Sequence, residues 1–360
     1  MVSQEIAALL FSQNCNPMFY IHQYSCIAAQ QFFTDHAIQT ITESVSNKLY
    51  AVAGNYDSIP PNILRRLGKA VKMGIATGNQ LISEYPVDGI VLGTANGGLE
   101  DCIKFLNQII QFEEGRLTPT NFVQSTTNAI AGQLGIMSSN KGYNITHVHR
   151  GLAFENALID VEMLLNEHPE NNYLLGGVDE ISDYNYTIED LAGAYKKEII
   201  SNTELLASST SGTIAGEGAA MFIVNTIKTH ASAVVKGIKT LHTTHEESVV
   251  QQLTSFLEEH LQKNETVDLI LSGKNGDVRQ NAFYKNIEEQ LPDTPVSYYK
   301  HLTGDFPTSS AVALWLTANV LNGTEFNNIL NIQSKKSIRH ILLYNTYKGK
   351  QHSFILVSAL

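Results

Sequence analysis

Two histidines flank a valine in the run His147-Val148-His149, and side chains at this spacing are candidates for metal binding or acid–base chemistry. Alternate residues of a strand point to the same side, so the two imidazole rings would lie on one face. A zinc site needs three or four ligands, and no third ligand lies nearby in the sequence. We therefore predict no metal site, and we interpret both histidines as packing and hydrogen-bonding residues at a subunit interface.

The thiols are the next candidates for chemistry. Cys15, Cys26 and Cys102 are too few for a disulfide framework and lack the paired spacing of a zinc site. Cys102 follows Glu100 and Asp101, whose carboxylates would raise the pKa of its thiol and make it a poor nucleophile. We interpret all three cysteines as reduced, and Cys102 as structural.

Two glycine-containing loops, 93–98 and 272–276, follow predicted strands. Neither has the glycine spacing of a dinucleotide fingerprint or the Lys-Ser/Thr pair of a phosphate loop. The sequence therefore predicts tight turns at these places, with no nucleotide or other cofactor.

Composition limits the classes of partner. The chain has 360 residues, 43% of them hydrophobic and 16% charged, which predicts a large core and a further buried interface. A net charge of -11 argues against nucleic acid and acidic membrane surfaces as partners. No basic residue precedes the short apolar run 6–11, and no stretch is long enough to span a membrane, so we predict a cytoplasmic protein without a secretory signal.

From Val87 onward, apolar runs alternate with helical patterns, which is typical of an α/β sheet covered on both faces. We expect strands at 87–92, 173–177, 219–224, 234–241, 267–271, 337–344 and 353–357, and helices at 99–112, 151–167, 246–262 and 311–321. Helix 151–167 carries Phe154, Leu158, Val161 and Leu165 on one face. The pattern restarts near residue 230, which predicts two α/β halves, 1–229 and 230–360, in one rigid body.

Short motifs recur along most of the chain: Gly93-Thr94-Ala95, Leu117-Thr118-Pro119, Gly176-Gly177-Val178-Asp179-Glu180, Gly216-Glu217-Gly218, Gly276-Asp277, Lys300-His301-Leu302-Thr303-Gly304 and Asn345-Thr346-Tyr347. In these motifs and their order, the chain resembles the thiolase-fold β-ketoacyl synthases, which condense acyl and malonyl groups on acyl carrier protein. The resemblance implies an α/β fold with two related halves in five αβαβα layers.

The resemblance also shows where the catalytic residues of that family would lie. The family's cysteine sits three residues before the glycine that opens the nucleophile helix, and counting back from Gly151 gives Val148. The segment of the first histidine contains Ser272 instead, and Asp305 replaces the second histidine after the retained Lys300. The family's glycine-rich gate reads Lys348-Gly349-Lys350-Gln351.

These replacements remove the groups that condensation needs. Valine cannot attack a thioester, and decarboxylation of a malonyl thioester requires donors that stabilise an enolate. An ionised Asp305 would repel that enolate, and we predict that it forms an internal ion pair with Lys300 instead. We therefore expect no condensation by this chain alone.

This pattern of losses resembles the chain-length factors, non-catalytic subunits that pair with an active synthase in type II fatty acid and polyketide systems. Arg65-Arg66-Leu67-Gly68 and Pro119-Thr120 with Phe122 resemble the members from aryl-polyene and flexirubin-type pathways. The resemblance implies a heterodimer in which this chain shapes the partner's acyl tunnel, and alanine at a bulky tunnel position would lengthen the product. The tunnel or interface candidates are Phe122, Thr127, Asn128, Val148, His149 and Phe154.

Acyl carrier protein is acidic, and this chain has 24 Lys and Arg against 35 Asp and Glu, so carrier docking would fall mainly to the partner. Two other functions stay open. One is an atypical acyltransferase or thioesterase-like enzyme that uses Ser272, Lys300 or Asp305. The other is a homodimeric acyl-binding protein without turnover.

Overall fold

The computed structural model describes residues 18–360 apart from 35–39, 53, 55, 58, 114 and 333–336. Cys15 and the apolar run 6–11 lie outside the described residues.

The elements up to residue 225 are β1 (Phe19–Ile27), η1 (Gln31–Phe33), β2 (Lys48–Leu49), α2 (Pro61–Leu64), α3 (Lys69–Glu84), β3 (Gly89–Gly93), α4 (Leu99–Gln111), α5 (Pro119–Gln124), α6 (Ala129–Ser138), β4 (Tyr143–His147), η2 (Arg150–Leu152), α7 (Ala153–Glu167), β5 (Tyr173–Asp179), α8 (Asp183–Leu191), η3 (Asn202–Ala207), β6 (Ala215–Gly216) and β7 (Gly218–Asn225).

The elements after residue 225 are β8 (Ala233–His242), α9 (Glu246–His260), β9 (Leu269–Ser272), η4 (Val278–Gln280), α10 (Asn281–Gln290), β10 (Val296–Tyr298), α11 (Lys300–Thr303), α12 (Ser309–Leu321), α13 (Asn327–Leu330), β11 (His340–Tyr347) and β12 (Gln351–Ser358).

Ten strands form one sheet in the order β10-β9-β11-β12-β8-β1-β7-β5-β3-β4. The two halves of this strand order have the same pattern, read from each edge towards the middle of the sheet. In one half β3 runs parallel to β4 and β5, and in the other β9 runs parallel to β10 and β11. Antiparallel strands then complete each group, and β1 pairs with β8 where the groups meet. We propose the division into 1–229 and 230–360 on this repeat, because residue 230 lies in the connection between β7 and β8.

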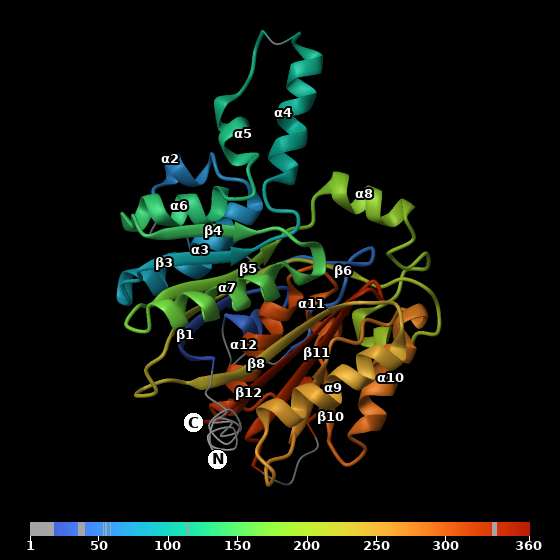
Figure 1. Ribbon diagram of the computed structural model, residues 1–360. Coiled ribbons are helices and arrows are strands. Elements are labelled where there is room, and N and C mark those ends of the chain that lie inside the picture. The colour runs from blue at the N-terminus through green and yellow to red at the C-terminus, as the bar shows by residue number, and fades with distance from the viewer. Residues whose placement is uncertain are drawn as a thin grey trace, which may run out of the picture.

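Three hydrophobic clusters give the fold its five layers (Figure 1). The central cluster contains α7 and α12, enclosed between the two strand groups. A second cluster holds α3 and α6 against β3, β5 and β7, and a third holds α9 and α10 against β9, β11 and β12. The α/β class with the thiolase-like arrangement is confirmed.

The predicted face of α7 is confirmed, since Phe154, Leu158, Val161 and Leu165 are all buried in the central cluster. Apolar residues surround α12 on every side, which is the pattern of a helix enclosed by protein. The predictions did not include strands β1 and β4. Their sequences, FYIHQYSCI and YNITH, mix polar with apolar residues and give no continuous apolar run.

The carboxylate of Asp179 connects the two halves. It lies at the end of β5 and is fully buried. Oδ1 accepts hydrogen bonds from Thr94 Oγ1 at 3.1 Å and from the amides of Ala95 and Asn96 at 2.9 and 2.8 Å. Oδ2 accepts from Thr308, at 3.2 Å from its amide and 2.9 Å from its hydroxyl. Because Thr308 is the residue before α12, the Asp179 side chain joins the loop after β3 in the first half to a helix of the second half.

We predict that Asp179→Ala lowers the free energy of unfolding by ~3–5 kcal/mol, because buried donors lose a charged acceptor. Urea denaturation measures this change. Asp183→Ala, at an exposed position in the first turn of α8, is the matched control and should cost less than ~1 kcal/mol. Equal losses in the two variants would contradict the role given to Asp179.

Candidate functional site

A cavity of about 520 Å³ lies where the parallel strands of both halves end. The first half contributes Asn96 after β3, Glu180 after β5, and residues of α8. The second half contributes segments 277–283, 305–307 and 347–350. The carboxyl ends of parallel strands are the usual place for a ligand site in an α/β fold. We call this space the strand-end cavity.

Asp305 lines the strand-end cavity and forms the predicted ion pair with Lys300. The Lys300 Nζ lies 2.8 Å from Asp305 Oδ1, and the lysine side chain is buried. Asn275 Nδ2 donates to the other carboxylate oxygen at 2.8 Å. The two charges therefore neutralise each other, and Lys300 is held by its neighbour instead of pointing at a ligand.

Ser272 lies apart from that ion pair. Its side chain is buried, and its Oγ donates to Glu288 Oε1 of α10 at 3.3 Å. Ser272 does not line the strand-end cavity. The structure therefore does not bring Ser272 and Asp305 to one reaction centre.

Val148 follows β4 directly, and 51% of it is exposed. It is absent from the lining of the strand-end cavity. His147 Nε2 lies 2.9 Å from Asp160 Oδ2, and His149 Nδ1 lies 2.9 Å from Asn156 Nδ2. Both histidines thus contact α7 of their own chain, through separate partners.

The remaining tunnel or interface candidates divide between surface and core. Phe122 is exposed on α5 and packs against Phe105, with ring centroids 5.3 Å apart. Thr127 is half-buried, and Asn128 is an exposed residue whose Oδ1 accepts from Thr146 Oγ1 at 2.8 Å. Phe154 is fully buried in the central cluster.

Arg150 and Glu155 lie close together in the sequence but have different partners. Glu155 is fully buried on α7, and Ser353 Oγ donates to its Oε1 at 2.9 Å. Arg150 instead lies with its Nη1 3.7 Å from Glu189 Oε1. Burial raises the pKa of the Glu155 carboxyl to about 7. The burial of Glu155 could have been predicted from the sequence, since Glu155 precedes the apolar Leu158 by three residues and lies on the same helix face.

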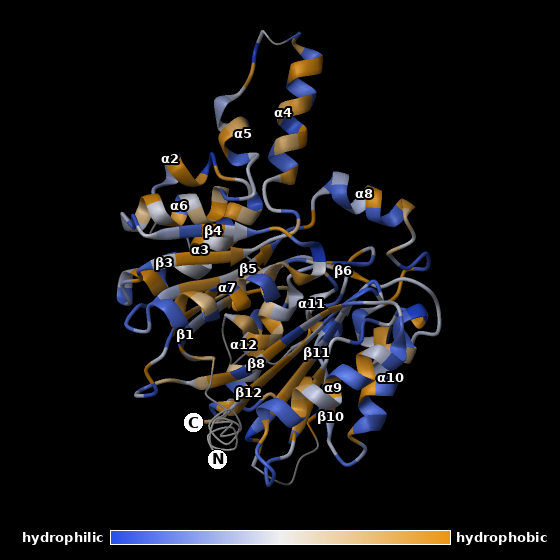
Figure 2. Ribbon diagram, viewed as in Figure 1, coloured by the Kyte–Doolittle hydropathy of each residue, from blue (hydrophilic) through white to orange (hydrophobic). Residues whose placement is uncertain are grey.

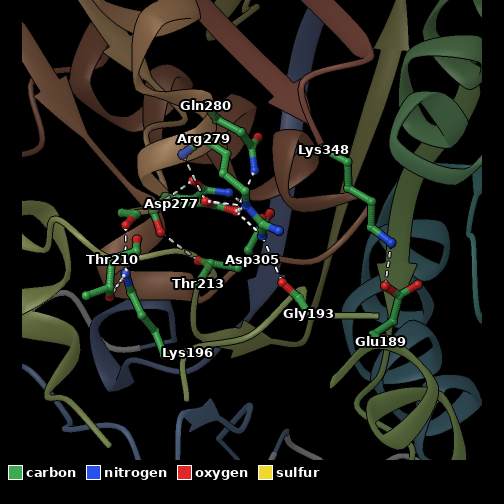
Figure 3. Close-up of polar contacts among 12 residues, drawn as sticks. Glu189, Gly193, Lys196, Thr210, Thr213, Asp277, Arg279, Gln280, Asp305 and Lys348 are labelled. Atoms are coloured by element: carbon green, nitrogen blue, oxygen red, sulfur yellow. Dashed lines mark hydrogen bonds and ion pairs between the residues drawn. The ribbon is translucent and has the colours of Figure 1, made fainter. Parts of the chain in front are cut away.

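Sequence reasoning also missed the ion pairs at the rim of the strand-end cavity (Figure 3). The Arg279 guanidinium donates to both oxygens of Asp277, at 2.9 Å from Nε to Oδ1 and 2.6 Å from Nη2 to Oδ2, and Nη2 also donates to Gly193 O at 2.8 Å. The Lys348 ammonium donates to Glu189 of α8. Arg279 and Lys348 therefore already hold carboxylates, which leaves these two cations poorly placed to attract an acidic ligand.

The two described cysteines, Cys26 and Cys102, do not line the strand-end cavity. Cys26 is buried on β1, and burial raises the pKa of its thiol. Cys102 is half-buried on α4. Across the described ranges, no group of three His, Cys, Asp or Glu side chains is placed to hold a metal ion. None of the described helices is long and apolar enough to cross a membrane.

The protein-family model for the N-terminal domain of β-ketoacyl synthases matches residues 42–255, which is more than half of the sequence. The chain therefore belongs to the β-ketoacyl synthase family. A comparison with curated proteins gives no match.

Solved structures of this family have the same fold. A β-ketoacyl synthase from Burkholderia phymatum STM815 has a TM-score of 0.77 and 14% identity, covering 96% of this chain and 100% of that chain. The complex of the ketosynthase ApeO with its chain length factor ApeC from Xenorhabdus doucetiae has a TM-score of 0.75 and 13% identity, covering 96% of this chain and 98% of that chain. The ishigamide ketosynthase/chain length factor has a TM-score of 0.74 and 10% identity, covering 95% of this chain and 99% of that chain. At these identities the likeness shows the shared fold.

We predict that Glu155 makes stability depend on pH. Its pKa rises from 4.5 to about 7 on folding, so the native state binds the proton more tightly and stability falls as pH rises through that range. Over this range the free energy of unfolding should fall by about 3 kcal/mol because of Glu155. Glu155→Gln should therefore gain about this much unfolding free energy relative to the wild type between pH 4.5 and pH 8. Urea denaturation across this range checks it, and Glu180, whose pKa burial also raises to about 7, titrates in both proteins and cancels.

Proposed function

We propose that this chain is a catalytically silent subunit that pairs with an active β-ketoacyl synthase in a type II fatty acid or polyketide system. The observation that carries the proposal is the Lys300–Asp305 ion pair, with its 2.8 Å contact. A carboxylate neutralised by lysine cannot replace a neutral imidazole that donates to an enolate. Val148 supports the proposal, because its side chain has no nucleophile.

A second argument comes from the edge of the sheet. Strand β4 pairs with β3 on one side, and its other edge has no strand partner among the described residues. An open strand edge invites pairing with another chain. The α4–α5 arm, residues 99–113 and 115–124, projects beyond the body near this edge (Figure 1).

The α4–α5 arm and its neighbours carry an apolar surface. Its exposed apolar residues are Leu106, Ile110, Phe112, Leu117, Phe122 and Val123. In Figure 2, hydrophobic orange segments alternate with hydrophilic blue ones along α4, and α5 is partly orange. A group of exposed apolar residues on one projecting segment is a candidate interaction site. We place the synthase partner on this arm and on β4, with Val148 at the same side.

The partner would carry most of the acyl carrier contacts, since this chain is acidic and two of the cations that line the cavity, Arg279 and Lys348, are engaged with carboxylates. We propose an aryl-polyene type pathway on the two motifs that begin at Arg65 and Pro119, and the cytoplasm as the place of action. Of the alternatives, an acyltransferase centred on Ser272 has little support, because that hydroxyl is buried against Glu288.

We predict that the chain gains no acyl adduct when it is incubated with acyl- and malonyl-loaded carrier protein. Intact mass spectrometry measures this, with an active synthase as the positive control that gains the acyl mass. A stable adduct on this chain would overturn the silent-subunit proposal and favour the acyltransferase.

We predict that Phe122→Asp weakens association with the copurifying active synthase at least tenfold, because a charge replaces an apolar anchor at the interface. Ile227→Asp is the matched control, since Ile227 is 52% exposed and Phe122 is 59% exposed, but Ile227 lies in the β7–β8 connection. Sedimentation of mixtures measures the association. If both variants bind as the wild type does, the proposed interface is wrong. If only homodimers form, the proposed pairing with an active synthase is wrong.

A further inference from the structure

The turn between β11 and β12 is tight and lies over the segment that follows Val148. Lys348 and Gly349 have φ values of +55° and +61°, so the chain reverses within residues 348–350. Tyr347 and Gln351 face each other across the hairpin as paired residues. Side chains of such a pair project to the same face.

The Gln351 side chain contacts the backbone of the turn that follows Val148. Its Oε1 accepts a hydrogen bond from the Gly151 amide at 3.0 Å, and its Nε2 donates to His149 O at 3.4 Å. Gln351 is buried. The amide side chain thus uses both its donor and its acceptor on the turn that carries residue 148.

Tyr347 contacts the same turn. A Cβ at Gly151 would overlap the Tyr347 side chain, so the two residues pack in direct contact. Tyr347 also lines the strand-end cavity, whereas Val148, His149 and Gly151 do not. The Tyr347 side chain therefore lies between the cavity and the turn.

The hairpin turn is also fixed from outside. Lys348 holds Glu189 of α8, and Glu189 Oε1 lies 3.7 Å from Arg150 Nη1. Arg150 itself has a φ of +51°, a conformation that is uncommon for a residue with a side chain and needs support. One carboxylate thus ties α8, the hairpin turn and the turn after Val148 together.

We infer that Gln351 and Tyr347 form a closed wall between the strand-end cavity and residue 148, so that residue 148 is reached only from the β4 side. A ligand that enters the strand-end cavity stops at this wall. An acyl chain meets Val148 only by crossing from the subunit that covers β4. The identity of that covering subunit rests on the function proposed above, while the wall itself rests on the contacts within this chain.

The first test uses the isolated chain and needs no partner. Hydrogen exchange of the Gly151 amide should be about a thousandfold or more slower than that of an unprotected amide, because the bond to Gln351 opens rarely. Gln351→Gly should abolish this protection, and Lys350→Gly, in the same turn, should retain it. Free exchange of Gly151 in the wild type would overturn the inference.

The second test uses Val148→Cys and maps alkylation by iodoacetamide peptide by peptide, which separates residue 148 from the native cysteines. The thiol should react in the isolated chain and be protected at least tenfold in the complex with the active synthase. Adding Gln351→Gly should restore reactivity in the complex by opening the route through the cavity, and Lys350→Gly should not.

A parallel variant, Phe122→Cys, separates the two ways of failing. If Phe122→Cys is protected in the complex while Val148→Cys reacts freely, the wall is open and the inference is wrong. If both thiols stay reactive, the partner does not cover the β4 side and the proposed interface is wrong. In that case the exchange of the Gly151 amide still decides whether the wall is closed.

Discussion

The buried carboxylate of Asp179 is the contact on which the arrangement of the site depends. It ends β5 and accepts hydrogen bonds from the loop after β3 and from the residue before α12. A carboxylate buried among apolar layers costs free energy, and here several short hydrogen bonds offset that cost. Because the donors come from both halves, the strand ends of the two halves are held at one place, and the strand-end cavity forms between them.

A second constraint explains why Lys300 is tolerated in the core. An unpaired buried ammonium would be strongly destabilising, whereas a lysine paired with a carboxylate can be nearly neutral. Gly304, with a φ of +71°, turns the chain so that Asp305 comes back to Lys300 after only five residues. Each of these two charges therefore has a partner of opposite charge within the chain.

Sequence reasoning reached much of this. It located most of the strands after residue 87 and the helices α4, α7, α9 and α12, because each has a clear apolar pattern, but it did not predict the other α-helices of that region. It predicted the Lys300–Asp305 pair from the opposite charges of the two side chains. It missed β4, whose sequence is mostly polar because an edge strand does not need to be apolar on both faces. It also left Glu155 unplaced, since its partner Ser353 is nearly two hundred residues away and no local pattern links them.

The sequence by itself determined the family motifs and the residue types at three positions, with valine at 148, serine at 272 and aspartate at 305, because these are properties of single residues. Only the tertiary structure decided which of those residues meet. Ser272 turns to α10, Asp305 lines the cavity, and Val148 lies on the other side of Tyr347 and Gln351. The reason is that strands far apart in the chain converge at one edge of the sheet, and the direction of each side chain there depends on register and turns that no local pattern encodes.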